Sequence, residues 1–293
     1  RAEAPGAFEL KPIGPGVYAA IDRDGKAGAN AGFVIGKEAV LVVDTFFDPA
    51  ASEALLGETR RLTKVPVRFV VNTHHHIDHT AGNAVFAKAG ATVIAQRNVR
   101  DWLKSENLRL LGGDAITPER RAAVEALRAP DVVYDGTLDI DLGGRVVRLR
   151  HPLGHTGGDT VVWVEDAKVV FMGDLFWRLA APNLIDARVA DWIATLDRIA
   201  KLGSETTFVP GHGDVGTLAD VQAFRGYLAD LSAFAAQASG DTAEADVLAR
   251  MTAKYGNWNF FKSLGVKGVG HMLAERAGTK RTPVPVADPT PFD

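Results

Sequence analysis

Short apolar runs separated by turn residues dominate the first part of the chain. Residues 16–21, 31–36 and 39–43 are such runs, and glycine, aspartate and asparagine lie between them. Runs of this length between such residues are typical of β-strands joined as hairpins. Residues 49–64 begin with a proline and then place apolar residues among charges, which predicts an amphipathic surface helix. Residues 67–71 return to a strand pattern.

The remaining pattern alternates between helical and strand-like segments. In chain order we predict a helix at 80–88, a strand at 91–95, helical residues at 97–128 with breaks at Gly112, Gly113 and Pro118, strands at 137–140, 145–149, 160–164 and 168–171, a helix at 189–202, a strand around Phe208, and a helix at 218–238. This order predicts two similar α/β halves that pack sheet against sheet, with helices outside.

The chain changes character near residue 240. Residues 243–254 have a helical pattern, and Trp258, Phe260 and Phe261 form an aromatic group that we expect to dock this segment on the core. Prolines dominate the end of the chain from Thr282. We therefore predict a main domain, 1–239, and a C-terminal helical extension with a proline-rich end, 240–293, packed on that domain.

Composition narrows the classes of function. The 293 residues are 46% hydrophobic and 24% charged, as in an ordinary globular enzyme. No apolar run approaches the roughly eighteen residues of a membrane span. A net charge of −3 without a basic run gives no footprint for nucleic acid or anionic lipid. We therefore expect a small-molecule substrate, no nucleic-acid partner and no membrane association, while the oligomeric state stays open.

The chain contains no cysteine, so a metal ion must be held by His, Asp or Glu. The numbered sequence begins at Arg1 without a methionine, as expected of a mature product after signal removal or of a trimmed chain. Both features fit export to a bacterial periplasm or secretion; the alternative is the cytoplasm.

A cluster of histidines follows the predicted strand at 67–71. The run from Thr73 to His79 reads Thr-His-His-His-Ile-Asp-His. His74 and His76, at alternate positions of a strand end, point the same way and would converge on one ion, while Asp78 and His79 would reach a second. The alternatives are a solvated polyhistidine turn or a site for a single ion that uses part of the cluster.

Three further positions complete the set of seven metal-ligand candidates. Glycine-flanked His155 would complete a three-histidine site, and His212, in Pro-Gly-His-Gly, would close the second site. Asp174 ends a buried apolar strand, where an isolated carboxylate is costly, so we expect it to bridge the two ions. The alternative for Asp174 is a cap of the following turn.

Other polar residues near these motifs receive different roles. For Asp44, at a strand end, we expect an orienting role behind the ligands rather than a metal bond. His75 is out of phase with its neighbours, and we expect it behind the ligands or exposed. We expect hydrogen bonds within their loops for Asp159 and Asp214, and structural or exposed positions for His151 and His271.

Together these residues resemble the metallo-β-lactamase superfamily. Its pattern is His-x-His-x-Asp-His, then a Gly-His-Thr histidine, a Gly-Asp aspartate and a final Gly-His, and the match runs from about Gly16 to Gly213. The resemblance implies a four-layer αββα sandwich of the α/β (α+β) class, with 1–239 as its catalytic domain. It implies one metal at His74, His76 and His155, a second at Asp78, His79 and His212, and Asp174 between them. Asp44 matches the family's early strand-end aspartate.

The resemblance says less about the substrate. β-Lactamases of the cysteine-containing subclass have Cys at the position of Asp174 and a basic residue three positions later, where this chain has Trp177. This argues against penicillin or carbapenem hydrolysis as the main activity, unless Arg178 faces the site. Lactonases and glyoxalase-type thioesterases are similar in their bridging aspartate, although a lactonase-like tyrosine is missing. We expect Phe46, Trp177 and Arg178 to line the substrate pocket, together with the loops around Phe46-Phe47 and 177–185.

The chemistry of such a site follows from its charge. Two Zn²⁺ ions lower the pKa of a bridging water from about 15.7 towards 7, and iron or manganese accept the same ligands. We therefore expect a metal-bound hydroxide to attack a carbonyl of a small cyclic amide, ester or thioester, as in a β-lactam or lactone. Asp78 would orient the water and relay its proton. The alternatives are a mononuclear iron dioxygenase of the same superfamily and a non-enzymatic metal-dependent binding protein.

Overall fold

Two β-sheets packed face to face form the centre of the protein. The computed structural model describes residues 6–284, so most of the proline-rich end, from Pro285 onward, lies outside the described residues. The first sheet has its strands in chain order: β1 (Phe8–Gly14), β2 (Val17–Asp22), β3 (Ala31–Ile35), β4 (Val40–Val43), β5 (Val67–Val71), β6 (Thr92–Gln96) and β7 (Val132–Tyr134). Strands β1 to β4 pair antiparallel and β4 to β7 pair parallel.

The second sheet follows in the next part of the chain. Its strands, in spatial order, are β12 (Thr207–His212), β11 (Val169–Trp177), β10 (Val161–Val164), β9 (Val146–Arg150) and β8 (Thr137–Asp141). All pairs are antiparallel except β11 with β12. The parallel pair brings the ends of β11 and β12 to the same edge of the sheet.

Alternate side chains of the strands supply two different cores. In β4, Leu41 and Val43 lie between the two sheets, while Val40 and Val42 lie beneath the outer helices. All four residues are buried, since this strand is covered on both faces. The apolar runs of the sequence are therefore strands sandwiched between layers.

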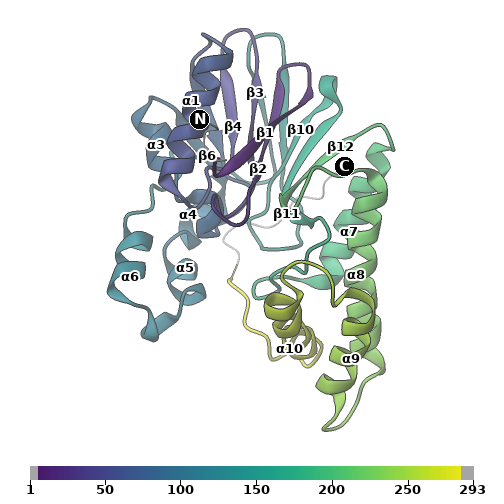
Figure 1. The fold of residues 1–293 in the computed structure, drawn as a ribbon. Helices are drawn as coiled ribbons and strands as arrows, with labels where there is room; N and C mark the ends of the chain where they lie inside the picture. The colour runs from purple at the N-terminus through teal and green to yellow at the C-terminus, as the bar shows by residue number, and fades with distance from the viewer. Residues whose placement is uncertain (1–5, 285–293) are drawn as a thin grey trace, which may run out of the picture.

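Helices cover the outer faces of both sheets, as Figure 1 shows. On the first side lie α1 (Pro49–Leu62), α3 (Asn83–Lys88) and α4 (Arg97–Trp102), while α5 (Ser105–Leu110) and α6 (Pro118–Glu125) lie below the sheet in this view. The short helix α2 (Ile77–Thr80) lies between β5 and α3 in the chain. On the second lie α7 (Val189–Ile199) and α8 (Leu218–Gln237). The side chains of Asp48 and Thr217 cap the first turns of α1 and α8. This arrangement is the four-layer αββα sandwich that the sequence predicted.

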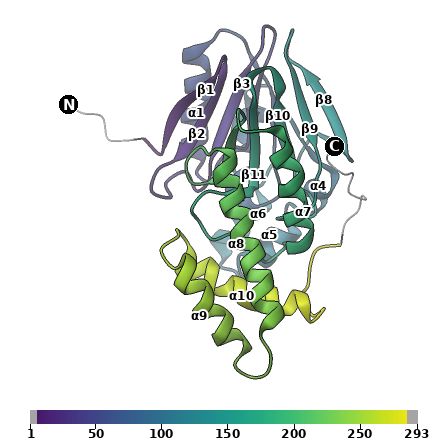
Figure 2. The ribbon, with the colours of Figure 1, turned by 90° about the vertical axis from the view of Figure 1, so that its right-hand side faces the viewer.

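The C-terminal segment packs at one end of α8 (Figure 2). It contains α9 (Ala243–Tyr255), a π-helical turn η4 (Phe261–Gly265) and α10 (Val266–Arg276). Met251, Phe261 and Met272 belong to the same buried cluster as Trp192 and Phe224 of α7 and α8. Trp258 stacks on Tyr227 with ring centroids 5.4 Å apart. The predicted division at residues 239 and 240 stays a prediction.

Several elements differ from the sequence-based prediction. β1 was not predicted, because we began the first strand at residue 16, and β7 was also missed. β11 continues to Trp177, beyond the predicted end at residue 171. The helical stretch 97–128 is broken after Trp102 as well as at the predicted glycines and proline. None of the helices among residues 6–284 has the combined length and apolar character needed to cross a membrane.

Candidate metal centre

Seven polar side chains meet at the edge where β5, β11 and β12 end. His74 and His76 follow β5, and Asp78 and His79 lie in the short helix α2. His155 lies in the loop between β9 and β10, Asp174 lies within β11, and His212 ends β12. The first sheet and the second sheet therefore each supply part of one cluster, and all seven predicted ligand candidates come together.

The first group contains His74, His76, His155 and Asp174, all of them buried. Nδ1 of His76 lies 3.1 Å from Nε2 of His155. Oδ2 of Asp174 lies 3.3 Å from Nε2 of His155 and 3.7 Å from Nε2 of His74. One oxygen of Asp174 thus faces three imidazoles.

The second group contains Asp78, His79 and His212, and the other oxygen of Asp174 faces it. Oδ1 of Asp174 lies 3.0 Å from Nε2 of His79 and 3.5 Å from Nε2 of His212. Oδ2 of Asp78 lies 3.3 Å from Nε2 of His212 and 3.6 Å from Nε2 of His79. Asp174 therefore stands between two sets of donors.

These separations match what two divalent ions require. Donors bound at roughly 2.0–2.1 Å around a tetrahedral ion lie about 3.3 Å from one another. Within the described part of the chain, Nε2 of His74, His79 and His212 and Oδ1 of Asp174 are buried without a hydrogen-bond partner. Buried polar atoms are normally satisfied, so their convergence indicates a place for a cation. The residues present thus fit a pair of metal ions.

Asp44 lies behind two of these histidines. Its carboxylate accepts hydrogen bonds from Nδ1 of His79 at 2.8 Å and from the backbone N–H and hydroxyl of Thr73 at 2.7 and 2.6 Å. The Thr73 oxygen in turn lies 3.1 Å from Nδ1 of His74. With protons on both Nδ1 atoms, the Nε2 atoms of His74 and His79 remain free to bind a metal. Asp44 therefore lies behind the ligand candidates, and its orienting role stays a prediction.

Asp186 contacts His76 as Asp44 contacts His79, and the sequence analysis missed this residue. Its carboxylate lies 3.1 Å from Nε2 of His76 and 3.4 Å from Nε2 of His75, which is buried rather than exposed. Arg109 of α5 donates to the other Asp186 oxygen and also pairs with Glu106. Asp186 therefore leaves Nδ1 of His76 for the metal-binding side.

The electrostatics of the centre reflect burial opposed by neighbouring charges. Burial would lower the pKa of His79, but the carboxylates of Asp174, Asp78 and Asp44 raise it well above its ordinary value. Burial would likewise lower the pKa of His212, yet Asp174 and Asp78 raise it to about 9. The opposite holds for His155, whose pKa falls to about 3, chiefly because of burial. The cluster is therefore rich in negative potential, which is what a cation site needs.

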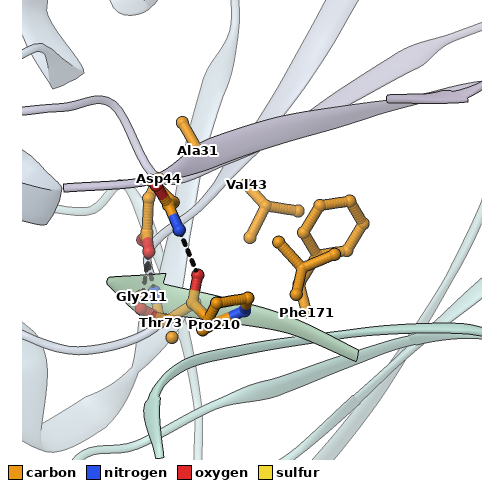
Figure 3. Close-up of a pocket in the computed structure, with 10 residues that line it drawn as sticks. Ala31, Val43, Asp44, Thr73, Phe171, Pro210 and Gly211 are labelled. Carbon is orange, nitrogen blue, oxygen red and sulfur yellow. Dashed lines mark hydrogen bonds between the residues drawn. The ribbon is translucent and has the colours of Figure 1, made fainter. Parts of the chain in front are cut away.

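Two glycines allow the backbone to approach the bridging aspartate. A Cβ on Gly211 would lie 1.9 Å from Oδ1 of Asp174, and one on Gly173, at φ +50°, would lie 2.4 Å from the Thr73 hydroxyl. Beneath them is a cavity of about 10 Å³ bordered by Asp44, Thr73 and Pro210 (Figure 3). A space of that size holds roughly one water. The floor of the centre is thus tightly packed.

A larger cavity opens above the centre, and two of the three predicted pocket residues lie outside it. Its volume is about 330 Å³, and Trp177 borders it as predicted, stacked on His212 with ring centroids 4.1 Å apart. Phe46 is a correction: it is fully buried beneath α1, and its neighbour Phe47 borders the cavity instead. Arg178 is a second correction, because it points to Asp220 of α8, 3.2 Å away.

The remaining polar residues lie apart from the ligand groups. Asp159 accepts hydrogen bonds from the backbone N–H and hydroxyl of Thr156. Nδ1 of His151 lies 2.7 Å from the carbonyl oxygen of Asp159. Asp214 pairs with Lys11 and accepts from the N–H of Val215. His271, on α10, is half-buried.

Comparison with curated proteins gives relatives that are hydrolases by name. The chain is 29% identical over 234 residues to "Acyl-coenzyme A thioesterase MBLAC2" of Bos taurus, covering 70% of this chain and 81% of that protein. It is 30% identical over 166 residues to "Hydroxyacylglutathione hydrolase" of Brucella anthropi, covering 56% of this chain and 53% of that protein. The chain thus spans about half the length of the second relative.

Solved structures share the fold. A metallo-β-lactamase from Pontibacter korlensis aligns with a TM-score of 0.61 at 23% identity, covering 76% of this chain and 99% of that one. The DIM-1 metallo-β-lactamase aligns with a TM-score of 0.59 at 19% identity, covering 76% and 98%. Residues 24–212 match the family model described as the metallo-beta-lactamase superfamily, a range that contains all seven ligand candidates. With its two facing sheets and the donors gathered at their common edge, this chain belongs to the metallo-β-lactamase superfamily.

Proposed function

We propose that the protein is a dinuclear, zinc-type hydrolase that cleaves the carbonyl–heteroatom bond of a small ester, thioester or lactone. The observation that carries the proposal is the position of Asp174, whose two oxygens face two separate donor groups. A site for a single ion would not explain why Asp78, His79 and His212 converge. Imidazole and carboxylate donors suit zinc, while iron and manganese accept them too.

The chain's residues divide the work of such a reaction. When bound, two divalent ions would supply Lewis acidity and make water a nucleophile near neutral pH. His74, His76 and His155 would hold one ion, Asp78, His79 and His212 the other, and Asp174 both. The side chain of Asp78 is 28% exposed and borders the cavity, whereas Asp174 is almost fully buried. Asp78 is therefore the carboxylate positioned to orient the attacking water and hold its proton.

The substrate class is inferred from two features. The two curated relatives above carry the names of enzymes that hydrolyse thioesters, which favours a carbonyl substrate with a sulfur or oxygen leaving group. Trp177 occupies the position at which β-lactamases of one subclass have a basic residue, and Arg178 is paired with Asp220. A β-lactam carboxylate would lack a cationic partner there, so β-lactam hydrolysis is proposed only as a side activity.

Metal content and substrate turnover test this proposal together. Elemental analysis of the purified chain should give about two zinc ions per chain, and a panel of thioester, ester, lactone and β-lactam substrates should show turnover on the first three. One iron per chain without hydrolysis would overturn the proposal in favour of an oxygenase. Two ions without turnover on any substrate would favour a binding protein.

Replacing Asp78 separates its catalytic role from folding. Asp78→Asn should lower kcat by about 100-fold or more, since an amide cannot accept the proton of the attacking water. The thermal midpoint should change far less than the rate. Asp214→Asn is the control. Asp214 lies on the same chain segment as His212, but its carboxylate pairs with Lys11 outside the centre. Full turnover by Asp78→Asn would remove this residue from the mechanism.

A further inference from the structure

The cavity above the metal centre has apolar walls. Phe47, Leu110, Leu111, Trp177, Phe260 and Leu264 border it, and they come from four separate stretches of the chain. His76, Asp78, Asp174 and His212 form its floor. Its volume of about 330 Å³ lies near the lower end of ligand pockets, so it suits a small substrate.

No lysine or arginine is among the described residues that border the cavity. Its titratable groups, His76, Asp78, Asp174 and His212, belong to the metal centre. The arginines next to two of the lining residues in the sequence are held elsewhere, Arg178 by Asp220 and Arg109 by Asp186 and Glu106. A carboxylate or phosphate on the part of the substrate inside the cavity would therefore be desolvated without a partner.

Phe260 forms a wall of this cavity from the C-terminal segment, outside the range that the family model matches. Its ring is edge-on to Trp177 and to His212, with centroids 6.0 and 5.9 Å away. The residue has a φ of 59°, in the left-handed region that is unfavourable for a bulky side chain. Its side chain is nevertheless 48% exposed, so burial of the ring in the core does not account for this conformation.

Backbone hydrogen bonds hold Phe260 in this position. Its carbonyl oxygen accepts from Ser263 and Leu264, and the preceding Asn259 exchanges backbone hydrogen bonds with Leu179 and Ala181 beyond β11. Strained residues fixed by their surroundings often lie at binding sites. The aromatic ring is thus presented to the cavity rather than to the core.

We propose that this cavity receives an uncharged, apolar acyl group of the substrate, and that Phe260 determines the selection for it. The proposal rests on the proposed hydrolase function and deepens it. The scissile carbonyl would lie at the floor, over Asp78 and Asp174, while the acyl chain contacts Phe260, Leu110 and Leu111. The C-terminal segment around Phe260, which lies outside residues 24–212 of the family match, would in this way set the substrate preference of the metal centre.

A matched set of esters tests the selection on the metal-loaded protein. The p-nitrophenyl esters of acetate and hexanoate and the mono-p-nitrophenyl ester of adipate share a leaving group, and the adipate ester has a carboxylate in place of the terminal methyl of hexanoate. We expect kcat/KM for hexanoate to exceed that for acetate and for mono-p-nitrophenyl adipate by about 10-fold or more. Equal values for hexanoate and adipate would overturn the proposal.

The variant Phe260→Gly removes the ring and also relieves the strained backbone, so its folding should be preserved. It should lower the ratio of kcat/KM for hexanoate to kcat/KM for acetate by about 10-fold. Leu179→Gly is the matched control, because Leu179 has a φ of 51° and is 51% exposed but does not border the cavity. If both variants behave alike, Phe260 does not determine selection.

A binding measurement separates this inference from the proposed activity. Methyl hexyl ketone, which cannot be hydrolysed, should bind the metal-loaded protein in a calorimetric titration, and its analogue with a carboxylate in place of the terminal methyl of the hexyl chain should bind at least about 10-fold more weakly. Phe260→Gly should weaken ketone binding by a similar factor. If no ester is cleaved but the ketone binds in this way, the hydrolase proposal fails and the pocket assignment stands. If esters are cleaved without these preferences, the hydrolase proposal stands and the pocket assignment fails.

Discussion

Two carboxylates, Asp44 and Asp186, contact the ligand candidates from behind. Asp44 reaches His79 directly and His74 through Thr73, and Asp186 reaches His76. Each hydrogen bond places a proton on one ring nitrogen and leaves the other available. The protonation pattern of the ligands is therefore built into residues that would not touch a metal.

Replacing Asp186 tests this orienting role. Asp186→Asn removes the charge that holds His76 and Arg109, so the affinity for Zn²⁺ should fall about 10- to 100-fold. Competition with a chromophoric chelator measures this affinity. Asp191→Asn is the control, because Asp191 is a more exposed aspartate paired with Arg188. An affinity equal to that of the control would rule out the orienting role.

The sequence located the seven ligand candidates because each lies in a short motif at a strand end. Asp186 has no such setting, and only the fold brings it to His76. Phe46 and Phe47 illustrate a different limit. They are neighbours in a connection where φ of Phe46 is 66°, and the sequence does not tell which of the two rings turns into the core.

At the level of elements, apolar runs predicted most strands. Strand ends were predicted wrongly where other residues interrupt an apolar run. Gly173 and Asp174 looked like the end of a strand, but β11 continues, and its pairing with β12 shifts register at this point. Asp174 thus lies within the strand rather than after it. β1 has a weaker signal, since its residues alternate between half-buried and exposed positions and include Pro12.

Alanine substitutions at Gly226 and Gly211 should change the free energy of unfolding in opposite directions. Gly226 lies inside α8, and a Cβ there would meet nothing within 4 Å. Gly226→Ala should raise the free energy of unfolding by about 0.5–1 kcal/mol, because alanine restricts the unfolded chain and favours the helix. Gly211→Ala should lower it and weaken metal binding, since its Cβ would collide with Asp174. Urea titrations of both variants check this, and a less stable Gly226→Ala protein would contradict it.

Three large buried clusters hold most of the described residues together, one between the sheets and one beneath each helical layer, and a fourth, smaller cluster contains Ile77, Leu103, Val124 and Leu127. The sequence predicted these layers from the alternation of strands and helices. Whether α9 and α10 form a unit separate from the main domain was harder to predict, because their apolar residues share a cluster with α7 and α8.

Buried tyrosines give the molecule a predictable response to alkali. Burial raises the pKa of Tyr134 and Tyr227 well above the ordinary value of 10.0. Above pH 10 the unfolded chain releases these protons while the folded chain retains them, so the free energy of unfolding should decrease as pH rises from there. Urea unfolding at neutral pH and just above pH 10 measures the loss. Tyr227→Phe should show a smaller loss than the parent chain; an unchanged loss would contradict the assignment.

The shared edge of the two sheets has one more consequence. Its donors come from distant parts of the sequence and meet only in the folded chain, so an ion bound there would act as a removable cross-link between the halves. By mass action, free metal at about 100 times its dissociation constant adds about 2.7 kcal/mol to the folded state. How long the protein persists folded would then depend on the metal supply of its surroundings as well as on its own sequence.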